Sequence, residues 1–341
     1  MSASTATETK RLPARSEASF TEGLRPGWIT VAGKEIADHV LSIRFYVLLV
    51  VLGIAALIPI YFASDRLRSL AQDVSGAPAI FLGLFTIGPD ADLGPITFTV
   101  QAFIAIAAPL LGVAFSFDSV NGERHEGTLP RLLSQPIHRD DVINGKFAAG
   151  LAVISIGLTA ILLIIAGFGM LRLGITPTFQ EVIRLIGWLA ITILYVSLWL
   201  AFGLLLSVVI RRAATSALVG FGVWLFVAIP IAGPLLASLL GGFLASGATT
   251  AAEAYGTLQW VQRILPGQLY AEASAAILRP GVTTVSYSDI YGGQEPPLLT
   301  TQLGFDQSLL LVWPHLVILF ALTIGCFALA YARFMRQEVR A

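Results

Sequence analysis

Long apolar runs separated by short polar segments dominate the pattern of this chain. Six runs come close to or exceed the roughly 20 largely apolar residues that a helix needs to cross a bilayer. They cover residues 45–63, 98–117, 147–171, 185–209, 217–240 and 309–331. None of them carries an Asp, Glu, Lys or Arg in its middle. The pattern predicts an all-α bundle of six membrane-spanning helices within residues 29–341, behind a polar tail over residues 1–28.

The segment before the first run has a helical pattern of its own. The tail lacks an apolar run with a small-residue cleavage site, so it is not a cleavable signal peptide, and we expect it to be disordered. Ile29, Ile36, Val40 and Ile43 are seven, four and three residues apart, which places them on one helix face. This spacing predicts an amphipathic helix along the membrane surface. A plain cytoplasmic extension of the first span is the alternative.

Prolines and short apolar stretches complicate the segments that follow the first and fifth runs. Pro230 and Pro234 fall inside the fifth run. They are compatible with an ordinary span that tolerates them, or with a broken helix whose second part turns back. Residues 64–97 include an apolar stretch that is too short to cross the membrane twice. Residues 257–278 show helical spacing around Pro266, which predicts helices between spans five and six.

Composition supports one membrane bundle rather than two soluble domains. Hydrophobic residues make up 56% of the 341 residues and charged residues 12%, about half the charged share of a soluble domain. The formal net charge is zero, which gives no electrostatic reason to expect a nucleic-acid partner. The single cysteine, Cys326, cannot form an internal disulfide.

The distribution of Lys and Arg predicts the orientation. With six spans and a cytoplasmic N-terminus, fifteen of these residues lie inside and six outside. Because positive charge accumulates on the cytoplasmic side, both termini are expected there, in a multi-pass protein of the cell membrane. Residues 118–146 are then cytoplasmic and residues 241–308 face outward.

The segment 118–146 is dense in charge and turn residues, and its order predicts local structure. Glu123 and Glu126 share a helix face, and Gly127 ends that helix. Thr128 is an N-cap for a second, two-turn helix that stops at Pro136. The apolar face of this second helix consists of Leu129, Leu132 and Leu133.

After Pro136, Asp140 and Asp141 cap the next helix, which enters the membrane past Lys146. An apolar patch rimmed by charge and presented to the cytoplasm is typical of a docking surface for another protein. Packing of the leucines against the chain's own helices or the lipid surface is the alternative.

This segment resembles the cytoplasmic loop of ABC-2-type transporter permeases. The closer likeness is to single-chain permeases of the nitrous-oxide-reductase accessory and gliding-motility export type. The matching positions are Glu123, Arg124, Glu126, Gly127, Thr128, Leu129, Leu132, Leu133, Ser134, Pro136, Ile137, Arg139, Gly145 and Lys146. The resemblance implies a coupling helix that sits in a groove of a separate ABC ATPase subunit, in an assembly with a second copy of the permease or a homologue.

The resemblance therefore implies a set of ATPase-coupling residues. They are Glu123, Arg124, Glu126, Gly127, Thr128, Leu129, Leu132, Leu133, Pro136, Arg139 and Lys146. The chain itself has no G-x-x-x-x-G-K-[ST] loop: Gly33-Lys34 is followed by Glu35, and Gly145-Lys146 by Phe147. We expect a subunit that is not an enzyme and has no cofactor of its own, with ATP bound by the partner.

Other functions are less favoured by the residues. The lack of charged groups within the spans disfavours a proton- or ion-coupled carrier. His125 and His138 are read as solvated loop residues rather than metal ligands, and His315 as an anchor at the membrane interface. The preferred hypothesis is the permease subunit of an ATP-driven exporter. The alternative is an ABC-type protein that transmits ATPase motion to an outer partner without passing a substrate, and an intramembrane enzyme comes third.

Overall fold

Helices form every regular element in the part of the chain that the structure describes. The computed structural model describes residues 26–73, 79–88, 99–129, 137–228, 232–248, 250–282, 285 and 302–337. Five stretches in these residues are long and apolar enough to cross a membrane. They are α2 (Ile43–Asp73), α4 (Val100–Ser116) continued through α5 (Asn121–His125), α7 (Arg139–Leu173), α8 (Phe179–Val209) and α14 (Phe305–Met335).

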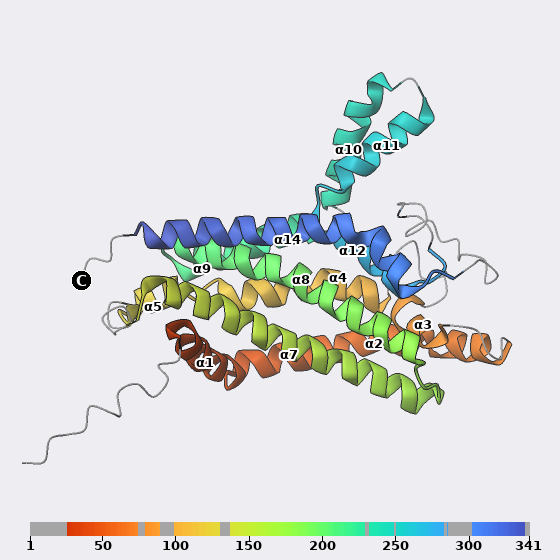
Figure 1. The fold of residues 1–341 in the computed structure, drawn as a ribbon, viewed down its shortest axis with the longest axis horizontal. Coiled ribbons are helices and arrows are strands. Elements are labelled where there is room, and N and C mark those ends of the chain that lie inside the picture. Colours follow the sequence, from red (N-terminus) through yellow and green to blue (C-terminus); the bar gives the residue numbers. More distant parts are fainter. Residues whose placement is uncertain are drawn as a thin grey trace, which may run out of the picture.

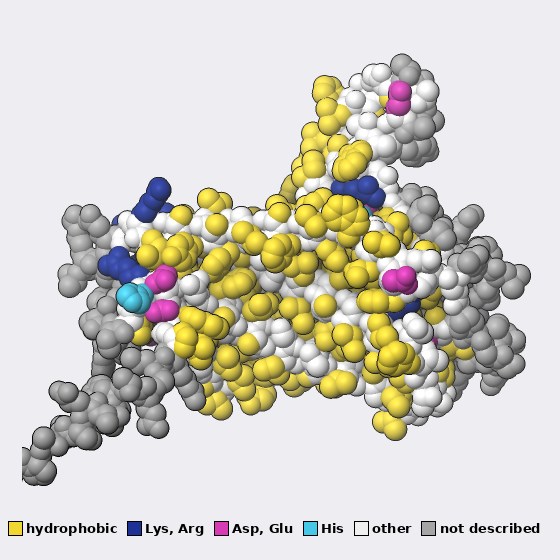
Figure 2. Space-filling model, in the orientation of Figure 1, with side chains coloured by type: hydrophobic (Ala, Val, Ile, Leu, Met, Phe, Trp, Pro, Cys, Tyr) yellow, Lys and Arg dark blue, Asp and Glu magenta, His cyan; other side chains and the backbone are white. Residues whose placement is uncertain are grey.

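The long helices lie side by side along the length of the molecule (Figure 1). One end of the bundle, here named the α5 end, carries α1 (Gly27–Val40), α5 and the last turn of α14. The opposite end, named the α12 end, carries α3 (Ile80–Thr86) and α12 (Pro266–Leu278). Apolar side chains cover the middle of the bundle in Figure 2, and charged side chains gather at both ends. This distribution is that of a polytopic membrane protein.

The described residues of the fifth apolar run form two shorter apolar helices, and neither is among the five long membrane-crossing stretches. The two helices are α9 (Ala213–Ala228) and α10 (Ala232–Leu244), with residues 229–231 outside the described part. Pro234 lies in the first turn of α10, where its missing N–H has no intrahelical partner to lose. Through η3 (Ala245–Gly247), α10 pairs with α11 (Ala251–Gln262), and this hairpin projects from the bundle (Figure 1). The helix α10 leads into this projecting hairpin and does not turn back along α9 (Figure 1).

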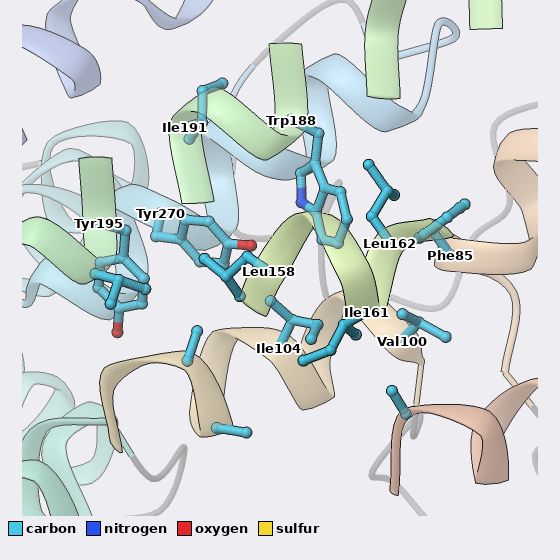
Figure 3. Close-up of a cluster of buried hydrophobic side chains, with 14 of the residues drawn as sticks. Phe85, Val100, Ile104, Leu158, Ile161, Leu162, Trp188, Ile191, Tyr195 and Tyr270 are labelled. Carbon is cyan, nitrogen blue, oxygen red and sulfur yellow. The ribbon is translucent and has the colours of Figure 1, made fainter. Parts of the chain in front are cut away.

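The core of the bundle is aromatic where α12 enters it. Figure 3 shows side chains from several helices meeting around Trp188, Tyr195 and Tyr270. The rings of Tyr195 and Tyr270 stack with centroids 4.5 Å apart. The hydroxyl of Tyr270 lies 2.9 Å from that of Thr192 on α8. Every residue of α12 from Gln268 to Leu278 is buried, so this short helix is part of the core rather than a surface loop.

The helix α3 is fixed to the same end by one buried carboxylate. Oε1 of Glu181, in the first turn of α8, accepts a hydrogen bond of 2.8 Å from the backbone N–H of Phe81. Oε2 of Glu181 accepts from the N–H and hydroxyl of Thr178 and so closes a capping box. The short apolar stretch in residues 64–97 therefore packs into the bundle, where Phe81, Leu82, Leu84 and Phe85 are buried.

A buried polar group at the α12 end contradicts the expectation for His315. This group, the Glu272 cluster, consists of Glu272, His315, Arg263 and Gln268. Oε2 of Glu272 lies 2.7 Å from Nε2 of His315 and accepts from Nε of Arg263 at 2.8 Å, and Oε1 accepts from Gln268 at 3.0 Å. The side chain of His315 is only 7% exposed, so it is a buried partner of Glu272 and not an interfacial anchor. The residues around His315 are apolar and do not indicate that it contacts Glu272, 43 residues earlier in the chain.

The pKa of Glu272 shows that its partners outweigh its burial. Desolvation alone would raise the pKa of this carboxyl, because burial penalises the charged form. Hydrogen bonds from His315, Gln268 and Arg263, together with the charge of Arg263, hold the pKa below its usual range instead. Through these contacts Glu272 joins α12 to the end of α11 and to α14.

The amphipathic N-terminal helix is present as α1, and of its expected apolar face Ile36 and Val40 pack against the bundle core while Ile29 is 38% exposed. Val31, Ala32 and Glu35 are the buried residues of α1. Ile43, expected on the apolar face, is 80% exposed and begins α2. The chain turns at Leu41–Ser42, so α1 is a separate helix and not an extension of the first span. Most of the tail expected over residues 1–28 lies outside the described residues.

Candidate coupling site

The loop between α4 and α7 leaves the bundle from a fixed point on α8. The hydroxyl of Ser207 accepts hydrogen bonds from the backbone N–H groups of Val120 (2.9 Å) and Asn121 (3.2 Å). Asn121 in turn donates from Nδ2 to the carbonyl oxygen of Ile210, at 3.2 Å. Val120 and Asn121 are fully buried. Because the first N–H groups of a helix have no partner within it, these contacts stabilise the start of α5.

Three helices meet at one buried ammonium group. Nζ of Lys146, in the second turn of α7, donates to Oε1 of Glu123 on α5 at 2.7 Å and to Oε1 of Glu35 on α1 at 3.0 Å. The Lys146 side chain is 3% exposed, that of Glu35 10% and that of Glu123 19%. We name Lys146, Glu123 and Glu35 the Lys146 triad. It joins the loop, the N-terminal helix and α7.

A second cation, Lys34, lies at the exposed edge of the triad. Nζ of Lys34 lies 3.4 Å from Oε1 of Glu35 and 3.1 Å from a carboxylate oxygen of Asp38. Burial alone would lower the pKa of Lys34, but the carboxylates of Asp38 and Glu35 outweigh that effect and raise it. The Lys34 side chain is 59% exposed, so its contribution is screened by solvent. The stabilising attraction in this region therefore belongs mainly to the triad.

The end of the loop is fixed to the beginning of α1. Oδ2 of Asp141 accepts from the N–H of His138, which caps α7 as the sequence predicted. Oδ1 of the same carboxylate accepts from the N–H of Trp28, at 3.0 Å, in the first turn of α1. Close approach of the two helices requires Gly145, because a Cβ there would lie 2.7 Å from Cβ of Val31. One aspartate thus holds both helix starts together.

The two arginines of the predicted site point toward the end of α14. Nη2 of Arg124 donates to the side-chain oxygen of Gln337, and Nη1 of Arg139 donates to the backbone oxygen of the same residue at 3.0 Å. Gln337 also donates from Nε2 to the carbonyl oxygen of Val208, at the end of α8 (2.8 Å). The loop is therefore fixed on two sides, by α1 and by the end of α14.

Between these fixed points, the described part of the loop presents a short exposed tip. His125, Glu126, Gly127 and Thr128 are exposed, and Gly127 has a φ of +70°, which glycine adopts readily at a helix end. Leu129 is only 2% exposed and turns into its own chain. It therefore does not present an apolar surface with its two neighbours. Leu132, Leu133, Pro136 and the rest of residues 130–136 lie outside the described residues.

Several of the residues that hold this site were not identified from the sequence. In the sequence Glu35 appeared only as the residue that follows Gly33-Lys34, yet it lies four residues after Val31 and three after Ala32 on the buried face of α1. A carboxylate on a buried helix face signals a buried cation. Ser207 and Gln337 carried no such signal, because their roles depend on how distant helix ends pack.

Comparison with known proteins identifies the family to which this arrangement belongs. The sequence pattern of the ABC-2 family transporter proteins matches residues 29–339. The chain belongs to the ABC-2 family of transporter proteins. It is also 28% identical over 141 residues to the probable ABC transporter permease protein NosY of Stutzerimonas stutzeri. That similarity covers 38% of this chain and about half of the relative, 49% of its length.

Membership in the ABC-2 family agrees with the architecture. The family assignment covers all five membrane-crossing stretches. It also covers α1 from Ile29 onward and the whole loop between α4 and α7. The resemblance read from residues 123–146 is therefore confirmed at the level of the family.

Proposed function

We propose that this chain is the permease subunit of an ATP-driven ABC exporter, moved by a separate ATPase that docks on residues 118–146. The observation that carries the proposal is the double fixation of this loop. Its start and end are held by the Lys146 triad, by Asp141 and by Gln337, while residues 125–128 between them are exposed. Force applied at the tip of a loop held in this way moves whole helices rather than bending the loop.

The Lys146 triad supplies position rather than direct recognition in this proposal. Lys146 is too buried to contact another protein, and Glu123 is engaged with it. Their role is to hold α5 and α7 at the angle from which Leu132 and Leu133 reach a groove of the ATPase. Glu126, Gly127 and Thr128 are exposed and form the rim of that contact. ATP is bound by the partner, and a second permease copy or a homologue completes the assembly.

The proposed orientation places the α5 end in the cytoplasm of a cell-membrane protein. Single cysteines introduced at Glu126 and at Thr176, in the connection between α7 and α8, are both on exposed residues at opposite ends of the spans. In a Cys326→Ser background, we expect an impermeant maleimide on intact cells to label position 176 and spare position 126. Permeabilised cells should show labelling of both. Labelling of position 126 alone on intact cells would contradict the orientation.

The isolated chain is expected to neither bind nor hydrolyse ATP, because it has no phosphate-binding loop of the P-loop type. Turnover by the purified polypeptide should match that of a mock purification from cells lacking its gene. The same assay on the complex with the co-purifying ATPase is the positive control. Turnover that follows the permease through successive purification steps, without a second polypeptide, would overturn the proposal.

A second candidate function is transmission of ATPase motion to an outer partner without substrate passage. The α10–α11 hairpin favours it, because this hairpin projects from the bundle and bears exposed Leu239, Phe243 and Trp260 (Figures 1 and 2). The two functions are separated by reconstituting the permease with its ATPase in liposomes. Export predicts ATPase activity that rises with a transported substrate, whereas force transmission predicts activity that rises only with an outer protein.

A further inference from the structure

Gln337, just after the last span, connects both sides of the coupling loop to the ends of α14 and α8. Gln337 uses all the polar groups that its side chain offers, and its backbone oxygen as well. The side-chain oxygen accepts from Arg124 before the exposed tip, and the backbone oxygen accepts from Arg139 after it. The side-chain nitrogen donates to Val208 at the end of α8. A shift of Arg124 or Arg139 relative to the end of α14 therefore disturbs these bonds.

Gln337 follows α14 directly, so the loop is linked to a long stiff element. The helix α14 ends at Met335, and the N–H of Gln337 donates to the carbonyl oxygen of Phe334 at 3.2 Å. From His315 to Met335 the helix has 21 residues without proline, which corresponds to about 30 Å at 1.5 Å per residue. A regular helix of this length transmits displacement along its axis with little bending.

The other end of this stretch carries the Glu272 cluster. His315, next to Pro314, contacts Glu272 on α12 at 2.7 Å, and Glu272 also holds Arg263 just after α11. Glu272 is fully buried, so a shift of His315 breaks a charged hydrogen bond in a dry site unless α12 follows. Retaining the bond therefore favours joint movement of α14 and α12.

We infer that α14 is the strut that carries motion of the coupling loop to α12 at the opposite end of the bundle. Gln337 is the positioning residue at the loop, and His315 with Glu272 is the connection at the far end. The inference rests on the proposed function, because it takes the loop as the point where an ATPase acts. It adds which of the spans transmits the movement and where that movement arrives.

The test uses a reporter cysteine on α12 in the complete complex. Ala271 precedes Glu272 and is 9% exposed, so a cysteine there reports opening around α12. In a Cys326→Ser background with the bound ATPase, maleimide labelling of Ala271→Cys is compared without nucleotide and in ATP with vanadate. We expect the two labelling rates to differ by at least about fivefold, the lower range of coupling between distant sites.

Gln337→Ala and His315→Ala should reduce this ratio to about one while the ATPase stays associated. Gln337→Glu keeps the acceptor for Arg124 but loses the donor to Val208, so it should retain only part of the ratio. Arg336→Ala changes an exposed neighbour and is the matched control, with the ratio of the parent. Thermal unfolding of each variant identifies any that fail to fold, and His315→Ala keeps the test decisive if Gln337→Ala does.

The results separate the inference from the proposed function. If the parent chain retains no ATPase, the proposed function fails. If the ATPase is retained but Ala271→Cys is labelled at the same rate with and without ATP and vanadate, α14 is not the strut. The same conclusion follows if Gln337→Ala and His315→Ala leave the ratio of the two labelling rates unchanged. Loss of the ratio in both variants with the ATPase still bound supports it.

Discussion

Replacing Leu133 with aspartate is expected to abolish co-purification of the ATPase while leaving the permease folded. In the proposed complex the new carboxylate lies in an apolar groove of the partner without a cation, which costs several kcal/mol even after relaxation. A loss of about 3 kcal/mol weakens association more than a hundredfold. Leu132→Asp should behave in the same way. The measurement is the amount of ATPase retained by tagged permease, alongside thermal unfolding of the permease alone.

The neighbouring Leu129 provides the matched contrast. It has the same side chain but is 2% exposed within its own chain. Leu129→Asp should therefore lower the thermal stability of the permease itself, in the presence or absence of the partner. If Leu133→Asp instead retains full ATPase association and destabilises the permease, the leucines pack internally and the docking proposal is wrong.

The second large effect is expected at Lys146. Lys146→Met removes the cation that two largely buried carboxylates share, and breaking a buried pair in this way costs about 3–5 kcal/mol. The triad joins α1, α5 and α7, so both the stability of the permease and its association with the ATPase should fall. Thermal unfolding in detergent and ATPase retention are the two measurements.

Two controls make the result at Lys146 specific. Lys34→Met removes a lysine that is 59% exposed from the same region, and exposed pairs contribute no more than about 1 kcal/mol. Adding Glu35→Gln and Glu123→Gln to Lys146→Met removes the uncompensated charges and should restore part of the lost stability. Equal losses for Lys146→Met and Lys34→Met, or no recovery in the triple variant, would mean that the triad does not stabilise the site.

The sequence predicted the parts of the fold that depend on local pattern. The length of the apolar runs alone predicts the five membrane-crossing stretches. Asp141 lies in the first turn of α7 and Gly127 just after the end of α5, where carboxylates and glycine are preferred. The described residues of the fifth run form two shorter helices, a division that hydropathy does not show because it counts only apolar residues. Both α9 and α10 are apolar, yet they are separate helices.

The candidate site was found in outline from the loop motif, but its supports depend on distant contacts. Lys146 was grouped with residues that touch the ATPase, whereas its partners Glu35 and Glu123 are 111 and 23 residues away and bury it. The Glu272 cluster was missed for the same reason. A lone histidine in an apolar run does not show which buried carboxylate it will meet.

The central claim, that residues 118–146 dock directly on a separate ATPase, is tested most directly by photo-crosslinking from Leu133. A photoreactive phenylalanine analogue is placed there in cells that express the whole complex, with the same analogue at Thr176 as the control. The account predicts a light-dependent product that contains both the permease and the ATPase from position 133 and none from position 176. Products from position 133 that contain only permease or lipid would contradict it.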